Sequence, residues 1–210
     1  MLLYLIRHGE SLFNAEQRIQ GQLDTQLSPL GIRQSQAIAE SFRGKPIAAV
    51  YCSPLARARG TAEPLARLLG VELRTDEQLK EINAGVFQGH VWSEIFAQWP
   101  EAAAAWKAQD PDFRIPGGES RRDLMTRGRA ALESIRETGL PQVAVVAHGG
   151  VLTAALKALL EIPAGRNPFL LYNGSISMAE WNQQFKLITL NQMEHLTIGG
   201  DDLRTRTGEL

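Results

Sequence analysis

The sequence has a single cysteine, Cys52, among 210 residues, so no disulfide can form within the chain. This scarcity does not indicate an oxidising compartment, and we expect Cys52 to be a small buried hydrophobic residue at a strand end. The sequence also lacks the uncharged apolar run of about 18 residues that a membrane-spanning helix requires. The best candidate, Val151 to Leu160, is short and contains Lys157. The apolar segment 1–6 is too short for a signal-peptide core, so we expect a cytoplasmic protein with no membrane partner.

An excess of charge of one sign is absent as well. The 22 lysine and arginine residues nearly balance the 23 aspartate and glutamate residues, and the formal net charge is −1. Such a weak overall field gives no reason to expect nucleic acid or an anionic membrane as a partner. Any attraction for an anion must therefore be local. The 44% hydrophobic and 21% charged content is ordinary for a globular protein with one well-formed core.

Short apolar runs alternate with longer helix-like segments along the chain. The runs that are typical of buried strands are Leu2 to Ile6, Ala48 to Ser53 and Val143 to Ala147. The segments with helical spacing are Pro29 to Phe42, Leu55 to Leu69, Arg121 to Arg136 and Val151 to Leu160. A final pair, Ser175 to Trp181 and Lys186 to Leu190, predicts an antiparallel hairpin. The alternation predicts an α/β three-layer sandwich: a mostly parallel central sheet with one antiparallel edge and helices on both faces.

The segment 91–116 departs from this alternation. Its apolar residues recur at i, i+3, i+4 and i+7, a spacing that predicts one apolar helix face made of Trp92, Ile95, Phe96 and Trp99. Pro100 stops that helix, and an alanine-rich stretch with Trp106 follows. We expect this segment to be a small helical cap inserted into a single domain that spans residues 1–210. The polar tail, about 196–210, is expected to fray.

Two histidines, His8 and His148, each follow a predicted buried strand, and each is followed by glycine. In open α/β sheets ligands bind beyond the carboxyl ends of the strands, so we expect both imidazoles to face one crevice. Glycine lets the backbone approach a ligand there, and a helix starting near Val151 would aim its free amides at an anion. Arg7 and Arg57 can bind phosphate oxygens bidentately. This combination indicates a site for a phosphate group.

Several short motifs occur in a fixed order along the chain. They are Arg7-His8-Gly9-Glu10 followed by Asn14, the stretch Gln20-Gly21 to Gly31 with Leu27-Ser28, the segment Ser53 to Glu63, Glu81 with Gly85 and Gly89, and His148-Gly149-Gly150. Over residues 1–191 this ordered set resembles the histidine phosphatase superfamily, in the branch with the cofactor-dependent phosphoglycerate mutases and their phosphatase relatives. Each motif alone is weak, whereas the ordered set is highly specific.

The resemblance implies that His8 is the nucleophile that takes a phosphoryl group and becomes phosphohistidine. The residues that it implies around this group are Arg7, Arg57, His148, Asn14, Gln20, Gly21 and Gly149. Glu81 matches the family's proton donor, which protonates the leaving alcohol and later takes a proton from water. Glu10 belongs to the signature, and a structural hydrogen-bonding role fits it at least as well as a catalytic one. Arginine and histidine charges would stabilise the transferring group without a metal or other cofactor.

The fate of the phosphohistidine separates two functions, since attack by water gives a phosphatase and attack by a bound product gives a mutase. The mutases carry Glu-Arg-x-Tyr-Gly at the proton donor, whereas here the arginine and tyrosine positions are Ile82 and Ala84. The chain is also shorter than those mutases. We therefore expect a phosphatase for small-molecule phosphate monoesters. A cobalamin precursor, a sugar or phosphoglycerate derivative, and a broad range of esters all fit as substrates.

Two other classes of protein fit the sequence less well than a phosphatase. A non-catalytic phospho-ligand binding module would lack the nucleophile or the acid, and both are present. A di-histidine metal hydrolase would need a further histidine at His-x-His or His-x-x-x-His spacing, and none occurs. The tryptophans and Phe96 of the cap either pack together or form a wall of the substrate site. His90 and His195 are expected to be loop and tail residues, and a homodimer is one expectation for an α/β enzyme of this size.

Overall fold

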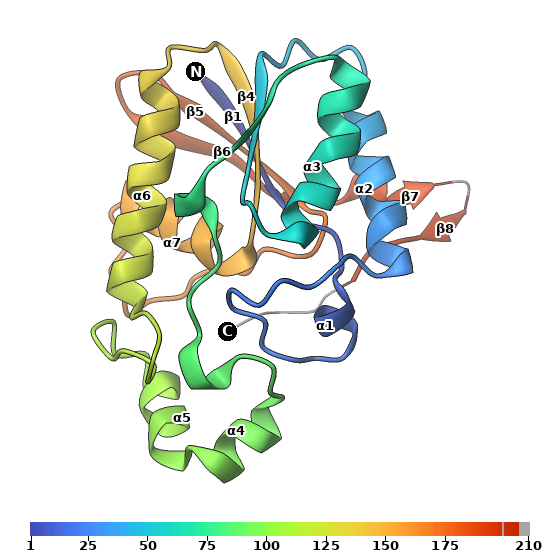
Figure 1. The fold of residues 1–210 in the computed structure, drawn as a ribbon. Coiled ribbons are helices and arrows are strands. Elements are labelled where there is room, and N and C mark those ends of the chain that lie inside the picture. The colour runs from blue at the N-terminus through green and yellow to red at the C-terminus, as the bar shows by residue number, and fades with distance from the viewer. Residues whose placement is uncertain (199, 206–210) are drawn as a thin grey trace.

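A six-stranded sheet runs through the centre of the computed structural model, which describes residues 1–198 and 200–205 (Figure 1). The strands lie in the order β3-β2-β4-β1-β5-β6. Their bounds are β1 Leu2–Arg7, β2 Ala49–Cys52, β3 Leu73–Thr75, β4 Gln142–Ala147, β5 Ile176–Trp181 and β6 Phe185–Gln192. The first four strands pair in parallel, while β5 is antiparallel to β1 and β6 to β5. The sheet confirms the predicted fold class, including the antiparallel edge.

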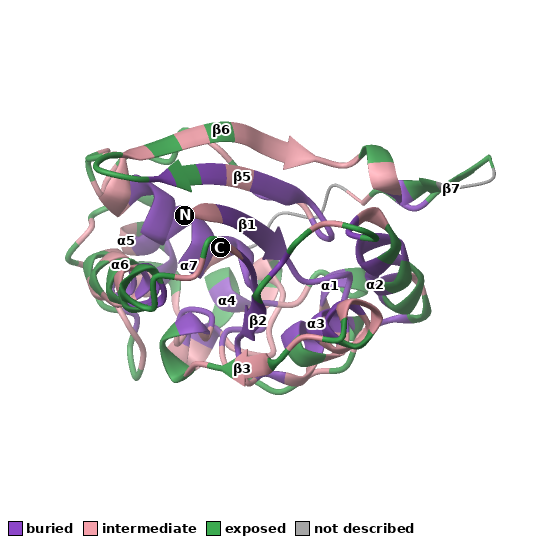
Figure 2. Ribbon diagram, turned by 90° about the horizontal axis from the view of Figure 1, so that it is seen from above, coloured by how far each residue is buried: buried purple, intermediate pink, exposed green. Residues whose placement is uncertain are grey.

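Helices cover both faces of the sheet (Figures 1 and 2). Helices α6 and α7 pack together on one face, and α2 and α3 pack together on the other. The helix bounds are α1 Leu12–Ala15, α2 Pro29–Ser41, α3 Ala56–Leu69, α4 Trp92–Gln98, α5 Pro100–Lys107, α6 Arg121–Glu137 and α7 Gly149–Leu159. Short 3-10 helices, η1 Glu77–Leu79, η2 Gly85–Phe87 and η3 Glu194–Leu196, lie in the connections. Neither α1 nor β3 was predicted, because each is too short to show a period.

The side chains of β1 alternate between the two faces, as they must in a strand that is covered on both sides. Leu3 and Leu5 are buried in the core cluster that includes residues of α6 and α7. Tyr4 and Ile6 are buried in the cluster formed with α2 and α3. The continuous apolar run at the start of the sequence is thus used on both faces, and Figure 2 shows β1 buried between the helix layers.

The pairing of β1 with β4 determines where the two histidines lie. The strands are parallel, with Arg7 opposite Ala147. His8 and His148 follow these residues directly, and the His8 amide donates a hydrogen bond to the Ala147 carbonyl oxygen at 2.9 Å. Both imidazoles therefore leave the sheet side by side at its carboxyl edge, where ligands bind in this class of fold.

Two short helices, α4 and α5, occupy the segment in which a cap is expected (Figure 1). The residues that pack into or against the main core are Trp92, Ile95, Trp99 and Trp106. Phe96 departs from the predicted apolar face: it is 37% exposed, and the Lys107 ammonium lies 4.4 Å from its ring centroid. Pro100 ends α4 and also starts α5, since the first turn of a helix does not need its amide proton.

The C-terminal segment differs from the fraying tail that the sequence predicts. Two short strands, β7 Thr197–Ile198 and β8 Asp201–Asp202, form an antiparallel hairpin. Leu196 and Leu203 are buried together with Ala37 of α2, so two leucines attach this mostly polar segment to the domain. Residues 199 and 206–210 of the expected tail lie outside the described residues.

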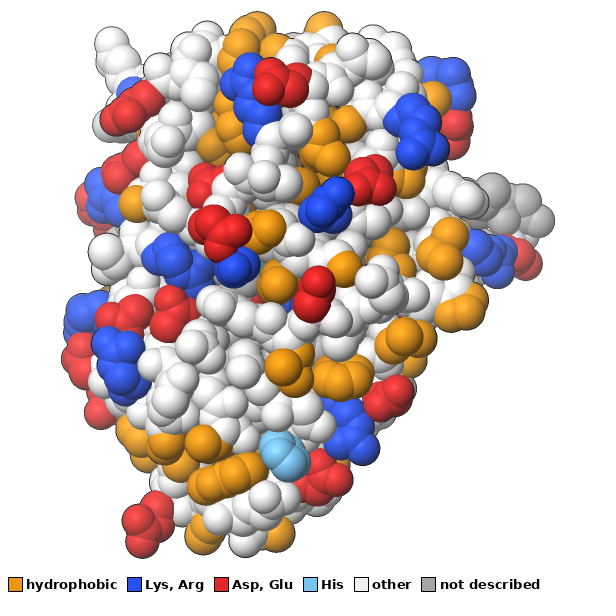
Figure 3. Space-filling model, in the orientation of Figure 1, with side chains coloured by type: hydrophobic (Ala, Val, Ile, Leu, Met, Phe, Trp, Pro, Cys, Tyr) orange, Lys and Arg blue, Asp and Glu red, His pale blue; other side chains and the backbone are white. Residues whose placement is uncertain are grey.

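The surface carries charges of both signs. On the face in Figure 3, lysine and arginine side chains are interspersed with aspartate and glutamate, in keeping with the near balance in the sequence. Apolar side chains gather on the same face over the end of the molecule where α4 and α5 lie. No helix in the described part of the chain has the length and apolar character needed to cross a membrane.

Candidate active site

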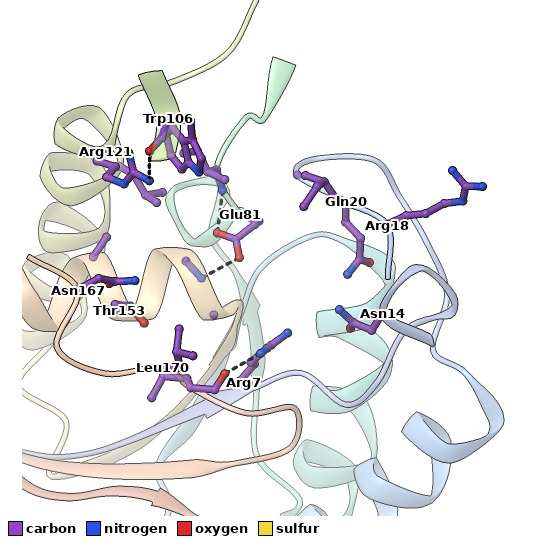
Figure 4. Close-up of a pocket in the computed structure, with 18 of the residues that line it drawn as sticks. Arg7, Asn14, Arg18, Gln20, Glu81, Trp106, Arg121, Thr153, Asn167 and Leu170 are labelled. Carbon is purple, nitrogen blue, oxygen red and sulfur yellow. Dashed lines mark hydrogen bonds between the residues drawn. The ribbon is translucent and has the colours of Figure 1, made fainter. Parts of the chain in front are cut away.

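A cavity of about 520 Å³ opens at the carboxyl edge of the sheet. The predicted site residues in its wall are Arg7, Asn14, Gln20, Gly21, Glu81 and Gly149. In Figure 4, Arg7 and Glu81 lie between Asn14 on one side and Thr153 on the other. This volume is typical of a pocket for a small molecule. Six of the predicted site residues, far apart in the sequence, thus meet around one space, whereas His8, His148 and Arg57 are not in its wall.

The two histidines lie behind this wall and are fully buried. The ring centroids of His8 and His148 are 5.0 Å apart, with the ring planes inclined by 64°. His8 Nδ1 lies 2.6 Å from the carbonyl oxygen of Gly9. Because a carbonyl oxygen can only accept, Nδ1 carries the proton of the neutral imidazole and Nε2 keeps its lone pair. The local backbone thus selects the tautomer in which Nε2 carries the lone pair.

His148 is held by Ser53, a residue that sequence reasoning did not assign to the site. His148 Nε2 lies 2.8 Å from Ser53 Oγ. The parallel register of β2 and β4 pairs Cys52 with Val146, which brings the residues after both strands together. A serine after a short apolar run has no distinctive signal of its own. Only the order of the strands shows that Ser53 faces a histidine.

The two predicted arginines are buried and bound to backbone carbonyl groups. Arg7 Nη1 donates to the Leu171 carbonyl oxygen at 2.6 Å. Arg57 Nη1 and Nη2 donate to the carbonyl oxygens of Leu23 and Gly21 at 2.9 and 2.8 Å. These bonds fix the planes of both guanidinium groups before any ligand is present. Fixed charges of this kind can stabilise an anion without reorganising.

The Glu81 carboxylate lies at the N-terminus of α7. Oε1 accepts hydrogen bonds from the amides of Ile82 and Val151 at 2.8 and 3.0 Å, and Oε2 accepts from the Gly150 amide at 2.9 Å. The sequence predicts that the amides at this helix start face a bound anion. That prediction is wrong for two of them, because α7 begins at Gly149 and directs these amides to the carboxylate. Amide donors and the helix dipole stabilise its negative charge.

The two glycines after His148 leave room for these groups. A β-carbon at Gly150 would press against Glu81, at 3.0 Å from its carboxyl carbon. A β-carbon at Gly149 would lie 3.3 Å from Arg7 Nε. The requirement for glycine here therefore comes from close packing of side chains rather than from unusual backbone angles.

A network of amide and hydroxyl groups holds the loop after His8. Asn14 Oδ1 accepts from the Ser11 amide and from Asn173 Nδ2, each at 3.1 Å. Gln20 Oε1 accepts from Ser11 Oγ at 2.7 Å. Asn173 Nδ2 also contacts the His8 carbonyl oxygen at 3.2 Å. Asn173 was missed in the sequence because only the pairing of β5 with β1 brings it to this loop.

Other polar residues singled out in the sequence have structural contacts. Glu10 Oε1 accepts from Ser28 Oγ at 2.7 Å, which agrees with the hydrogen-bonding role that the sequence allows. His90 is in the loop before α4, as expected, and its Nδ1 lies 3.3 Å from a carboxylate oxygen of Glu94. His195 is more enclosed than a tail residue, because its Nε2 donates to a backbone carbonyl at 2.9 Å. Burial lowers the pKa of its imidazole.

Cys52 is a structural residue, and the described residues contain no cluster that could bind a metal ion. Cys52 ends β2 as a buried free thiol, as the sequence predicts, and burial raises its pKa to about 12. Within residues 1–198 and 200–205, no group of three or more histidine, cysteine, aspartate or glutamate side chains is arranged to hold a metal ion.

The cap contributes part of the cavity wall. Trp92 and Trp106 line the cavity, whereas Phe96 and Trp99 do not. Trp99 instead packs edge to face against His90, with ring centroids 5.1 Å apart. Of the cap aromatics, Trp92 and Trp106 thus form part of the cavity wall, whereas Trp99 and Phe96 pack against other side chains. The apolar residues that line the cavity with the tryptophans include Ile82, Leu124, Met125, Leu170 and Leu171.

Comparison with known proteins finds relatives that match most of the chain. The chain matches the histidine phosphatase superfamily (branch 1) over residues 3–192. Glucosyl-3-phosphoglycerate phosphatase of Mycobacterium tuberculosis is 36% identical over 191 residues, which cover 86% of this chain and 83% of that protein. The probable phosphoglycerate mutase GpmB of Yersinia pestis is 38% identical over 189 residues, or 86% of this chain and 85% of that protein.

Comparison of the fold with solved structures finds the same kind of relative. The structure of a mycobacterial glucosyl-3-phosphoglycerate phosphatase in complex with VO3 aligns with a TM-score of 0.82 at 34% identity, over 90% of this chain and 98% of that chain. A phosphatase is thus found among the relatives by sequence and by structure, which supports a phosphatase enzyme. The chain belongs to the histidine phosphatase superfamily, branch 1.

Proposed function

We propose that this protein hydrolyses small-molecule phosphate monoesters through a phosphohistidine formed on His8, without a metal ion. The observation that carries the proposal is the hydrogen bond from His8 Nδ1 to the Gly9 carbonyl oxygen, which leaves the lone pair on Nε2. The named phosphatases among the relatives support the hydrolytic outcome. The cavity wall at Arg7 and Gly149 lies one residue from each histidine, which supports entry of the ester at this point.

In the first step, His8 Nε2 attacks phosphorus, so that an N–P bond forms and the P–O bond of the ester breaks. The equatorial oxygens of the phosphoryl group are stabilised by Arg7, Arg57 and a protonated His148. The negative charge of the bound phosphate favours a protonated Glu81 despite its amide donors, because two adjacent anions repel each other. The leaving alkoxide takes its proton from this carboxylic acid and departs as an alcohol. The fixed guanidinium groups suit this step, because a loose phosphoryl transition state depends mainly on positioning and charge.

In the second step, water attacks phosphorus and the N–P bond breaks. The Glu81 carboxylate takes a proton from this water, inorganic phosphate leaves, and His8 recovers its lone pair. Glu81 is then protonated again for the next ester. The amides of Ile82, Gly150 and Val151 stabilise the carboxylate that exists between the two steps.

A phosphoglycerate mutase activity is the second candidate, because a probable mutase is among the relatives. The positions at which the mutases carry arginine and tyrosine are the buried Ile82 and Ala84. Apolar side chains there cannot hold an anionic phosphoglycerate for a second transfer. This difference favours water as the acceptor.

The test is release of inorganic phosphate from a panel of phosphate monoesters in the presence of a chelator. Wild-type protein should release phosphate, and His8→Ala should lose at least about a thousandfold in kcat, as nucleophile deletions do. The His90→Ala variant is a matched control, because His90 lies outside the site. An alkaline quench should trap phosphate on His8 for detection by mass spectrometry. Undiminished turnover by His8→Ala, or loss of wild-type turnover in chelator, would contradict the mechanism.

The same panel separates the two candidates if it includes 3-phosphoglycerate with 2,3-bisphosphoglycerate. Phosphate release should outrun isomerisation to 2-phosphoglycerate. Isomerisation that outruns phosphate release would replace the phosphatase with a mutase.

Other expectations from the sequence remain predictions. They are the cytoplasmic location, the homodimer, the absence of a nucleic-acid partner, and the division of a single domain into a body and a cap at 91–116. The last of these is supported by Trp92 and Trp106, which belong to 91–116 and line the cavity.

A further inference from the structure

The charges in the cavity wall are mostly positive, although the chain as a whole has a formal net charge of −1. The charged residues that line the cavity are Arg7, Arg18, Arg121, Lys157 and Glu81. Arg7 belongs to the phosphoryl site, and Arg18 forms ion pairs with two glutamates at 3.1 and 3.2 Å. Arg121 and Lys157 are therefore cations that the proposed reaction does not use. We call them the Arg121–Lys157 pair.

Arg121 is held in place while part of its guanidinium has no partner. Its Cζ lies 3.4 Å from the ring centroid of Trp106, and Nη2 donates to the Trp106 carbonyl oxygen at 3.0 Å. Nη1 is buried and has no hydrogen-bond partner in the part of the chain that the structure describes. Burial lowers the pKa of this guanidinium, and the Asp110 charge opposes that shift. In Figure 4, Arg121 lies on the same side of the cavity as Asn167 and Thr153.

Lys157 is the second cation of the pair and is 4% exposed. Its ammonium donates to the Ala164 carbonyl oxygen at 2.8 Å, which uses one of its three protons. Burial, and then the charge of Arg121, lower its pKa. Neither cation has an ion pair with a carboxylate within the described residues. Lys157 is buried and Arg121 is partly buried, so two charges of like sign raise the free energy of the site, and a bound anion would offset this.

One face of α7 connects the phosphoryl site to this pair. Gly149, Thr153 and Lys157 all line the cavity, and their spacing of four residues places them on the same side of the helix. At about 1.5 Å per residue, the eight steps from Gly149 to Lys157 correspond to about 12 Å.

We propose that the Arg121–Lys157 pair binds a carboxylate on the alcohol part of the substrate, at the far end of the cavity from the phosphate. The two available donors, Arg121 Nη1 and the Lys157 ammonium, match the two oxygens of a carboxylate. Because the phosphoryl site and the pair lie at different levels of α7, the alcohol must be an extended one with the carboxylate several bonds from the ester oxygen. The substrate class is thus a long, acidic phosphate monoester, and the proposal rests on the function proposed above.

A purely structural role for Arg121 is the alternative, since its guanidinium also stacks on Trp106. A structural brace would affect all ligands of the cavity alike. A carboxylate site would instead distinguish a charged ligand from a neutral one of the same shape. The test therefore measures a preference between two ligands rather than a single affinity.

The experiment is isothermal titration calorimetry with 8-phosphonooctanoate and with its amide, 8-phosphonooctanamide. Both have a carbon–phosphorus bond that the enzyme does not cleave, and a flexible chain that can reach from one site to the other. Wild-type protein should bind the acid about tenfold more tightly than the amide, as one charge-assisted contact gives. Arg121→Gln and Lys157→Gln should each reduce this preference to about threefold or less, and two variants on different helices guard against misfolding of one.

Arg122→Gln is the matched control, because Arg122 is the next residue of α6 but pairs with Asp112 at the surface. It should keep the tenfold preference. Equal binding of acid and amide by the wild type, or an equal loss of preference in Arg122→Gln, would refute the carboxylate site. Phosphate release from phenyl phosphate is measured separately. Release without a preference for the acid refutes only this inference, and a preference without release from any ester refutes only the phosphatase.

Discussion

Gly150→Ala tests the position of the proton donor with the smallest possible change. The added methyl group would overlap Glu81 Oε1 most severely, and it would lie 3.0 Å from the carboxyl carbon and 3.2 Å from Oε2. Non-bonded heavy atoms prefer about 3.5–4.0 Å, and Oε1 is the closest of the three atoms, so the carboxylate must move by roughly 1 Å or more. The backbone itself has no reason to change, because Gly150 is inside α7 and alanine favours a helix.

The displacement should lower activity and stability together. A misplacement of about 1 Å in a catalytic group can cost about a hundredfold, so we expect this loss in kcat where the alcohol needs protonation. The amides of Gly150 and Val151 also lose their charged acceptor, at about 1.5 kcal/mol or more each. The higher helix propensity of alanine should stabilise the folded state by about 1 kcal/mol. The net free energy of unfolding should therefore fall by about 2 kcal/mol.

The assay compares two substrates and two variants. A nitrophenyl phosphate has a leaving group that needs little protonation, whereas an alkyl phosphate requires the acid. Gly150→Ala should slow the alkyl ester by about ten times more than the nitrophenyl ester. Gly149→Ala is the matched control, because it gains the same helix propensity but approaches Arg7 instead of Glu81. It should slow both esters by the same factor.

Urea denaturation of both variants gives the stability part of the prediction. If Gly150→Ala turns over alkyl phosphates at the wild-type rate and is more stable than the wild type, the reasoning is refuted. That result would mean that the carboxylate moves aside at no cost, and that Glu81 is not the proton donor.

Three further predictions concern residues around the site. Ser53→Ala removes a partner of the buried His148, so stability should fall by about 1–3 kcal/mol in urea titrations and phosphate release should slow; unchanged values would contradict it. Arg57→Ala removes the donor from two carbonyl oxygens, so it should lower the free energy of unfolding by roughly 3 kcal/mol and abolish most activity. Arg59 is exposed on the same helix, and Arg59→Ala should lower the free energy of unfolding by less than about 0.5 kcal/mol. Equal costs for the two arginines would refute this. Burial lowers the pKa of His195 below 6.5, so the unfolded chain binds its proton more readily, and stability should decrease as pH falls through 6.5 toward the folded pKa. His195→Gln should flatten this part of the pH dependence of the urea midpoint, and an unchanged slope would disprove it.

Much of the fold could be read from local patterns. The apolar run before His8 and the similar run before His148 indicate strands that are buried on both faces, and β1 and β4 are such strands. Helical spacing predicted α2, α3, α6 and α7 within a few residues. The short β3 and the C-terminal hairpin were not predicted, because two or three residues carry no period. Leu203 fixes that hairpin to α2 through a contact that no local pattern reveals.

For the site, too, the sequence indicated the residues, whereas only the structure showed their contacts. The residue types at the strand ends indicated a phosphate site, and His8 and Glu81 could be named as nucleophile and acid from the ordered motifs. The contacts of these residues could not be derived, since they depend on neighbours that are distant in the sequence. Ser53 and Asn173 reach the site only through the pairing of β2 with β4 and of β1 with β5.

The sequence by itself determined the family and its class of chemistry, because the expected nucleophile, acid and arginines are a matter of residue type and order. The tertiary structure decided which nitrogen of His8 keeps its lone pair and which groups hold Glu81. It alone also placed the Arg121–Lys157 pair in the same cavity. The physical reason is that hydrogen-bond partners and unbalanced charges are properties of positions in space, and strand order and helix packing set those positions.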